Sequence, residues 1–194
     1  IHCEEPHEEF LKTGGKTHGF QIWVNLPSSH KMMEPRYQEV PSTESPIVEQ
    51  DGVWARVIAG ECMGTTSSID TKIPITLIHV KMKPKSRLVQ HLQADLNGMI
   101  YVFGGGINLE NETRVKKSPI AFGIGAKQGI QDGELAILSE GEEIVIKSEE
   151  GAEFLIFAGP ELNEPIERYG PFVMNTKEEI HQAFSDYQNG TFVN

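Results

Sequence analysis

Short apolar runs with a period of two residues, separated by turn-forming residues, dominate the middle of the chain. Successive side chains of a β-strand point to opposite faces, so this period indicates strands with one buried face. The runs are rich in Val, Ile and Phe and lie at residues 53–59, 75–82, 99–103, 135–138, 144–147 and 154–158. Glycine and proline turns lie between them. Many short strands with frequent turns favour an antiparallel sandwich or barrel over βαβ units.

The first 50 residues have a different organisation. Phe20, Ile22 and Val24 alternate with polar residues and predict one more strand, at residues 20–26. Residues 31–50 contain three prolines and several Ser, Thr and Glu residues, which indicates an extended polar linker. We therefore place a domain boundary near residues 40–52 and interpret what precedes it as the end of another domain.

One helix is expected, at the C-terminus. Thr176 and Glu179 have the spacing of a capping box, in which each side chain satisfies a free amide of the first turn. The apolar residues that follow fall at helical spacing and form one stripe: Ile180, Ala183, Phe184 and Tyr187. Asn189-Gly190 ends the pattern. We expect this helix to cover a sheet.

The charge of the chain excludes two classes of partner. There are 17 Lys and Arg against 28 Asp and Glu, which gives a net charge of −11. Direct binding to nucleic acid or to an anionic membrane needs a basic face, and no apolar window is long enough to span a bilayer. Cys3 and Cys62 make no disulfide framework, so we expect reduced thiols in an intracellular protein, with Cys62 inert.

His2-Cys3-Glu4 carries the sharpest chemical signal. On a strand, His2 and Glu4 project from the same face, and an imidazole beside a carboxylate is part of a non-haem iron site. The same spacing also arises by chance, so both interpretations stay open at this point. No pair among the other histidines has the spacing of a metal site. His79 lies mid-strand, where we expect a core histidine bonded to a carbonyl group.

Two segments together resemble the signatures of the pirin family. The first is His18–Pro27, followed by Lys31–Gln38; the second is Gly170–Thr176. Asp51–Val53 and Val57–Glu61 are similar to the opening of the family's second domain. The resemblance covers essentially the whole chain in order.

The resemblance implies an all-β fold of the cupin type, an antiparallel β-barrel or jelly roll. Pirins have two cupins, and the first holds iron through three His and one Glu. By this resemblance residues 1–50 are the C-terminal part of the metal-binding cupin with its linker. Residues 51–175 are a complete, metal-free second cupin, and 176–194 are the C-terminal helix and tail. His2 and Glu4 are implied as ligands of Fe(2+), with two further His ligands expected upstream of residue 1.

Two functions follow from the resemblance. The first is a quercetin 2,3-dioxygenase-type activity on a flavonol-like aromatic substrate, with Glu4 as the catalytic base and O₂ as co-substrate. The alternative is a non-catalytic transcription cofactor or scaffold that contacts proteins such as transcription factors and acts in the cytoplasm or nucleus. We expect a monomer in either case. A true absence of upstream histidines would leave only the second function.

Overall fold

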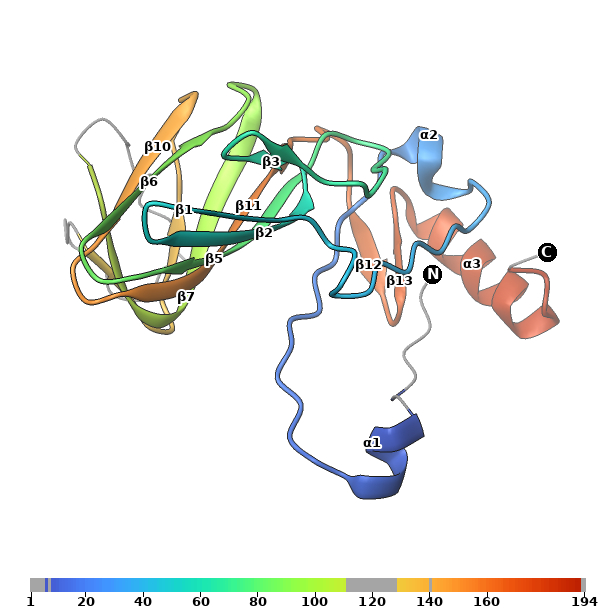
Figure 1. Ribbon diagram of the computed structural model, residues 1–194. Coiled ribbons are helices and arrows are strands. Elements are labelled where there is room, and N and C mark those ends of the chain that lie inside the picture. The colour runs from blue at the N-terminus through green and yellow to red at the C-terminus, as the bar shows by residue number, and fades with distance from the viewer. Residues whose placement is uncertain (1–5, 7, 111–128, 140, 193–194) are drawn as a thin grey trace. The chain divides into compact units, whose positions relative to one another are not determined.

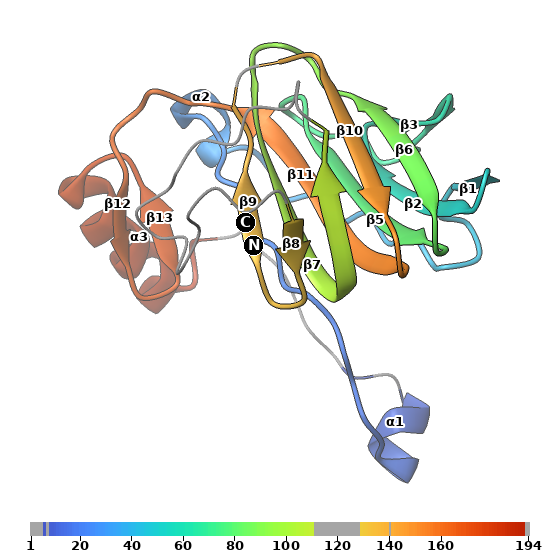
Figure 2. The ribbon, with the colours of Figure 1, turned by 90° about the vertical axis from the view of Figure 1, so that its left-hand side faces the viewer.

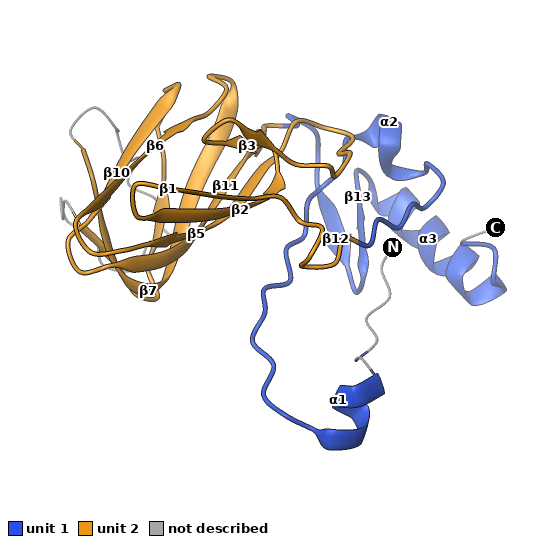
Figure 3. Cartoon of the chain, in the orientation of Figure 1, with its two compact units in different colours: residues 1–39, 162–194 blue, residues 40–161 orange. Residues whose placement is uncertain are grey.

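The computed structural model describes residues 6, 8–110, 129–139 and 141–192 (Figure 1). They form two compact units (Figure 3). One is Val40–Glu161, and the other combines Ile1–Glu39 with Leu162–Asn194. The chain therefore passes from residues 1–39 into the unit Val40–Glu161, and residues 162–194 return to the unit that contains residues 1–39. The division into residues 1–50, 51–175 and 176–194 stays a prediction.

The unit Val40–Glu161 is a curled antiparallel sheet (Figure 2). Its strands are β1 (Ile47–Gln50), β2 (Val53–Ala59), β3 (Glu61–Cys62), β4 (Thr65–Thr66), β5 (Thr76–Met82), β6 (Ser86–His91), β7 (Leu96–Leu109), β8 (Gly129–Gln131), β9 (Leu135–Ile137), β10 (Glu143–Ser148) and β11 (Ala152–Pro160). The main sheet has the order β1-β2-β5-β11-β7-β10-β6, with β8 and β9 also paired to β7. β3 and β4 form a separate pair. The expected antiparallel all-β architecture is confirmed.

Buried and more exposed residues alternate along the strands, and the buried ones form the core of this unit. In β2 and β5 every second residue is buried, and the residues between them lie on the outer face. Val57, Ile78 and Phe154 are completely buried and belong to one continuous apolar cluster that also includes Ile100 and Ile146. Burial of such side chains contributes about 1.5–3 kcal/mol each, so this cluster is the main source of the barrel's stability.

The other unit contains three helices and one hairpin within its described residues. These are α1 (Glu8–Thr13), α2 (Ser28–Lys31), β12 (Glu167–Tyr169), β13 (Phe172–Met174) and α3 (Lys177–Asn189). Thr176 caps α3 and forms the predicted capping box with Glu179, and Gly190 ends the helix in a left-handed conformation. α3 packs on β12 and β13, as expected for a helix that covers a sheet. No helix in the described residues is long and apolar enough to cross a bilayer.

One local prediction is wrong. Residues 14–27 contain no strand and run as an irregular trace between α1 and α2 (Figure 1). An alternating segment becomes a strand only where a neighbouring strand pairs with its backbone. The predicted apolar stripe of α3 faces the hairpin: Ile180 and Ala183 are buried there and Phe184 is partly buried. Tyr187 is 68% exposed, but its ring lies 6.1 Å from that of Phe172.

Candidate functional site

The predicted metal ligands His2 and Glu4 lie outside the described residues, as does His7. Their assignment as ligands therefore stays a prediction. Among residues 6, 8–110, 129–139 and 141–192, no group of three or more His, Cys, Asp or Glu side chains could hold a metal ion. A metal site built on His2 and Glu4 would need further ligands from elsewhere.

The inner face of β6 carries no imidazole. Leu88 and Gln90 point into the barrel, whereas the side chain of His91 is 78% exposed. The Gln90 amide donates to the backbone carbonyl oxygens of Glu61 at 2.9 Å and of His91 at 2.7 Å. This part of the interior thus offers a hydroxyl, an amide and aliphatic groups. The expectation that the second barrel holds no metal stays a prediction.

Cys62 is buried in the barrel. Burial, with a smaller contribution from the charge of Glu61, raises the pKa of its thiol to about 11. The thiol therefore keeps its proton at neutral pH, and only the thiolate is a good nucleophile or metal ligand. This agrees with the expectation of an inert thiol.

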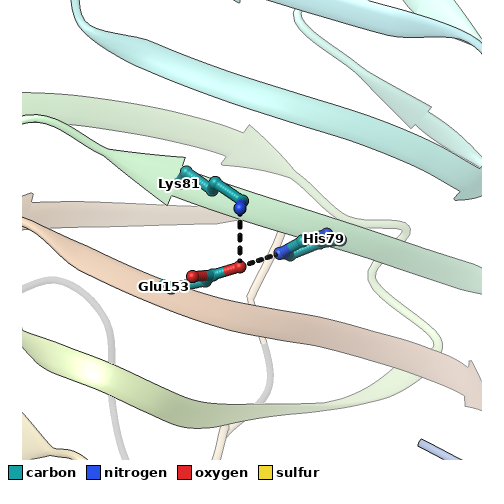
Figure 4. Close-up of polar contacts among 3 residues, drawn as sticks. All are labelled: His79, Lys81 and Glu153. Atoms are coloured by element: carbon teal, nitrogen blue, oxygen red, sulfur yellow. Dashed lines mark hydrogen bonds and ion pairs between the residues drawn. The ribbon is translucent and has the colours of Figure 1, made fainter. Parts of the chain in front are cut away.

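A charged cluster lies on the outer face of the barrel sheet, where β5 pairs with β11 (Figure 4). The Glu153 carboxylate oxygen Oε1 lies 2.7 Å from His79 Nε2 and 3.0 Å from Lys81 Nζ. His79 and Glu153 are diagonal neighbours across the two strands, close enough for their side chains to meet. Glu153 therefore bridges two side chains of the adjacent strand.

Aromatic rings flank this cluster. The His79 ring meets Trp54 edge-on at 5.3 Å between centroids and lies 5.7 Å from Phe103. Arg56 and Lys81 place their cations 5.5 and 5.7 Å from the Trp54 ring centre, respectively. The imidazole is therefore packed between two aromatic rings, and its side chain is 21% exposed.

Burial and hydrogen bonding together determine the protonation of the cluster. It lowers the pKa of His79, and the hydrogen bond to Glu153 opposes this only in part. Burial alone would raise the pKa of Glu153, but hydrogen bonds from Lys81 and His79 outweigh it and lower that pKa. At neutral pH the cluster is a carboxylate held by a neutral imidazole and an ammonium group. One imidazole and one carboxylate fall short of the three protein ligands of a catalytic zinc site.

The structure corrects the interpretation of His79. The histidine is not in the core and its partner is not a carbonyl group, because its side chain is 21% exposed and bonds to a carboxylate. The partner is 74 residues away in the sequence. The spacing of His79 and Lys81 could have indicated a shared strand face, but no local signal points to Glu153.

We expect the barrel to become less stable as the pH is lowered below about 6.5, because of His79. A histidine whose pKa is lower in the folded state binds its proton first in the unfolded chain, so acid favours unfolding. The stabilisation is present above about pH 6.5 and is lost as the pH falls through the lowered pKa. In His79→Gln, which keeps a donor near Glu153, the free energy of unfolding should change less between pH 7.5 and 5.5. Urea titrations at both pH values measure this, and equal losses in the two proteins would contradict it.

A model of the pirin C-terminal cupin domain matches residues 77–193. The chain is 35% identical over 191 residues to the pirin of Homo sapiens, and the match covers 97% of this chain and 60% of that protein. It is 37% identical over 186 residues to a pirin-like protein of Solanum lycopersicum, and the match covers 95% of this chain and 60% of that protein. The chain thus spans about 60% of the length of these relatives.

The solved structures similar to this chain include two that are at least 28% identical to it. One is a quercetin 2,3-dioxygenase from Acinetobacter baumannii, with a TM-score of 0.74 and 32% identity over 88% of this chain and 55% of that chain. The other is the protein GK1651 from Geobacillus kaustophilus, with a TM-score of 0.62 and 28% identity. This match covers 74% of this chain and 54% of that chain. The cupin fold expected from the sequence is confirmed by these matches.

Proposed function

Because the chain belongs to the pirin family, we propose that it is part of an iron-binding cupin protein with quercetin 2,3-dioxygenase-type activity. The observation that carries the proposal is the similarity to a quercetin 2,3-dioxygenase along 88% of the chain. His2-x-Glu4 supports it with the donor types that suit Fe(2+), a neutral imidazole and a carboxylate. Two further histidines upstream of residue 1 would complete the ligand set.

In this proposal the roles of the two residues differ. A bound metal supplies Lewis acidity, which lowers the pKa of a coordinated hydroxyl group. His2 holds the metal through one ring nitrogen. Glu4 accepts the proton of the flavonol hydroxyl as general base, and a positioned base of this kind contributes about 10²–10⁴-fold to the rate. The barrel of residues 40–161 would then serve as a scaffold.

The net charge of −11 favours a second candidate function. An acidic protein attracts basic protein surfaces and is repelled by nucleic acid. A non-catalytic cofactor that contacts a basic transcription factor, in the cytoplasm or nucleus, fits this charge. Iron would then be regulatory or absent, and no flavonol turnover would be observed.

Iron content tests the proposed site. The protein purified with its upstream residues should contain close to one iron per chain, measured by plasma mass spectrometry. His2→Ala should lower iron affinity by more than about tenfold, because even outer-shell changes around a metal cost 10–100-fold. His91→Ala is the matched control, since that side chain is exposed and lies outside the proposed site. Iron-free wild-type protein would contradict the site.

A further inference from the structure

A pocket of about 150 Å³ lies within the unit that contains α2 and α3. Its lining comes from two parts of the chain. Ser28 and Met32 contribute from α2 and the residue after it, and Met174 and Ala183 contribute from β13 and α3. An apolar cavity of about 150 Å³ is large enough to bind benzene. The pocket therefore accommodates one aromatic or branched aliphatic side chain.

One carboxylate holds the two parts of the lining together. Glu164 Oε2 accepts the backbone N–H of Ser28 at 2.7 Å, and Oε1 accepts the Ser28 hydroxyl at 3.1 Å. The side-chain amide of Asn175 donates to the same Oε2 at 2.9 Å. Hydrogen bonds to an ionised acceptor are about twice as strong as neutral ones. The pocket is thus preformed, and a ligand does not have to order it on binding.

The apolar lining of the pocket has a buried part and an exposed part. Met174 and Ala183 are buried and belong to the apolar cluster of this unit. Met32 is 69% exposed. A methionine side chain is flexible and adapts its shape to an apolar partner. A ligand side chain that enters the pocket and covers Met32 would remove apolar surface from water, which favours binding.

The charged groups at the pocket favour a cation. Asp186 lines the pocket and forms no ion pair with any residue that the structure describes. Lys31 also lines it, but its ammonium group donates to Asn25 Oδ1 at 2.6 Å and is attracted by Glu164 and Glu179. The charge of Lys31 is therefore offset within the unit, whereas the charge of Asp186 is left for a ligand.

From these observations we propose that the pocket anchors a partner protein through a segment in which an apolar side chain of the size of Phe or Leu lies next to a Lys or Arg. The apolar side chain packs against Met174 and Ala183, and the cation pairs with Asp186. A buried apolar anchor inside a polar rim is the usual form of a protein interface. The net charge of −11 attracts such a basic segment. The inference goes beyond the proposed iron site and does not depend on it.

Three fluorescent peptides test the proposal on the protein with its upstream residues. The first has one Phe between Lys residues, the second has Ala in place of the Phe, and the third has Glu in place of every Lys. Fluorescence anisotropy measures the dissociation constant of each peptide. Hydrogen exchange of α3 and β5 locates the site, because α3 lines the pocket and β5 belongs to the barrel.

We expect the Phe peptide to bind and to slow exchange in α3 but not in β5. The Ala peptide should bind about tenfold weaker or more, the usual effect of removing the anchor of an interface. The Glu peptide should not bind. Equal binding of the Phe and Ala peptides would overturn the proposal, because the protein would then attract only the Lys charges. Slower exchange in β5 instead of α3 would overturn it as well.

Asp186→Asn tests the charged contact. Asp186 Oδ1 accepts a hydrogen bond from the Gln182 amide at 2.7 Å, and asparagine keeps this oxygen. The Phe peptide should bind about two- to fivefold weaker to this variant, the usual value of an exposed ion pair. Asp132→Asn is the matched control, since it removes the same charge from an exposed turn of the barrel unit. Equal binding to both variants would overturn the pairing with Asp186.

Other occupants of the pocket give different results. If no peptide binds, the pocket is covered or unused in the protein with its upstream residues, and the proposal is overturned. If sedimentation shows a dimer that the Phe peptide dissociates, a second copy is the occupant, which also overturns it. Iron content is measured on the same protein. Iron-free protein that binds the Phe peptide would reject the iron site and leave this inference intact.

Discussion

Glu4→Gln is expected to lower flavonol turnover by about 10²–10⁴-fold, the usual contribution of a general base. The amide keeps the size of the side chain and one donor oxygen for a metal, but it cannot accept the flavonol proton. Turnover is measured as loss of flavonol absorbance together with O₂ consumption. The protein must carry its upstream residues, and the assay must contain excess iron so that weaker metal binding does not limit the rate.

Glu8→Gln provides the control for this experiment. Glu8 is a carboxylate of α1 that lies 3.8 Å from the Lys12 ammonium group, and both side chains are exposed. Its loss should leave the rate unchanged. If Glu4→Gln holds iron and still turns over flavonol at the wild-type rate, Glu4 is not the base. If the wild type has no turnover while it holds iron, the non-catalytic cofactor function is favoured.

The sequence predicted those elements whose signal is local. The run at residues 53–59 coincides with β2 (Val53–Ala59), and the capping box of Thr176 and Glu179 marks the start of α3. Both depend on residues a few positions apart. β6 (Ser86–His91) was not predicted, because the inward-facing Ser86 and Gln90 break the apolar alternation. Buried polar residues that bond to backbone groups remove the pattern that sequence analysis depends on.

Long-range contacts could not be predicted from one sequence. Glu153 meets His79 across 74 residues, and Glu164 meets Ser28 across 136 residues. No spacing rule links such positions. They meet only when two strands pair, or when residues 162–194 return to the unit that contains residues 1–39. The proposed metal ligands differ from these contacts, because they have a local signal in the sequence. His2 and Glu4 were found from a local motif, and their surroundings lie outside the described residues.

Gly105→Ala is expected to destabilise the barrel by roughly 2–5 kcal/mol, the sum of a backbone and a steric cost. Gly105 has a φ of +67°, in the left-handed region that side chains with a Cβ adopt at a cost. A Cβ atom at this position would overlap the carbonyl oxygen of Gly151. Ala152 is its register partner on β11. The close approach of the two backbones therefore requires glycine at position 105.

The position of Gly105 explains why the structure cannot easily relax. β7 pairs with β11 up to Gly105, and on its opposite edge its pairing with β8 starts at Gly106, so two pairings meet at this point. A shift of Gly105 away from Gly151 would disturb both pairings. Strain at this position is therefore not relieved without a change in one of the two strand pairings. A surface turn, in contrast, can relieve strain by a change in its own backbone.

Gly133→Ala separates the two costs. Gly133 has a φ of +80° but no atom within 4 Å of the position of a Cβ, so only the backbone cost of about 1–2 kcal/mol applies. Urea unfolding at pH 7.5 gives the free energy of unfolding for both variants and the wild type. Gly105→Ala should lose clearly more stability than Gly133→Ala. Equal losses would mean that β7 and β11 separate at this point without cost, and that the junction does not constrain the barrel.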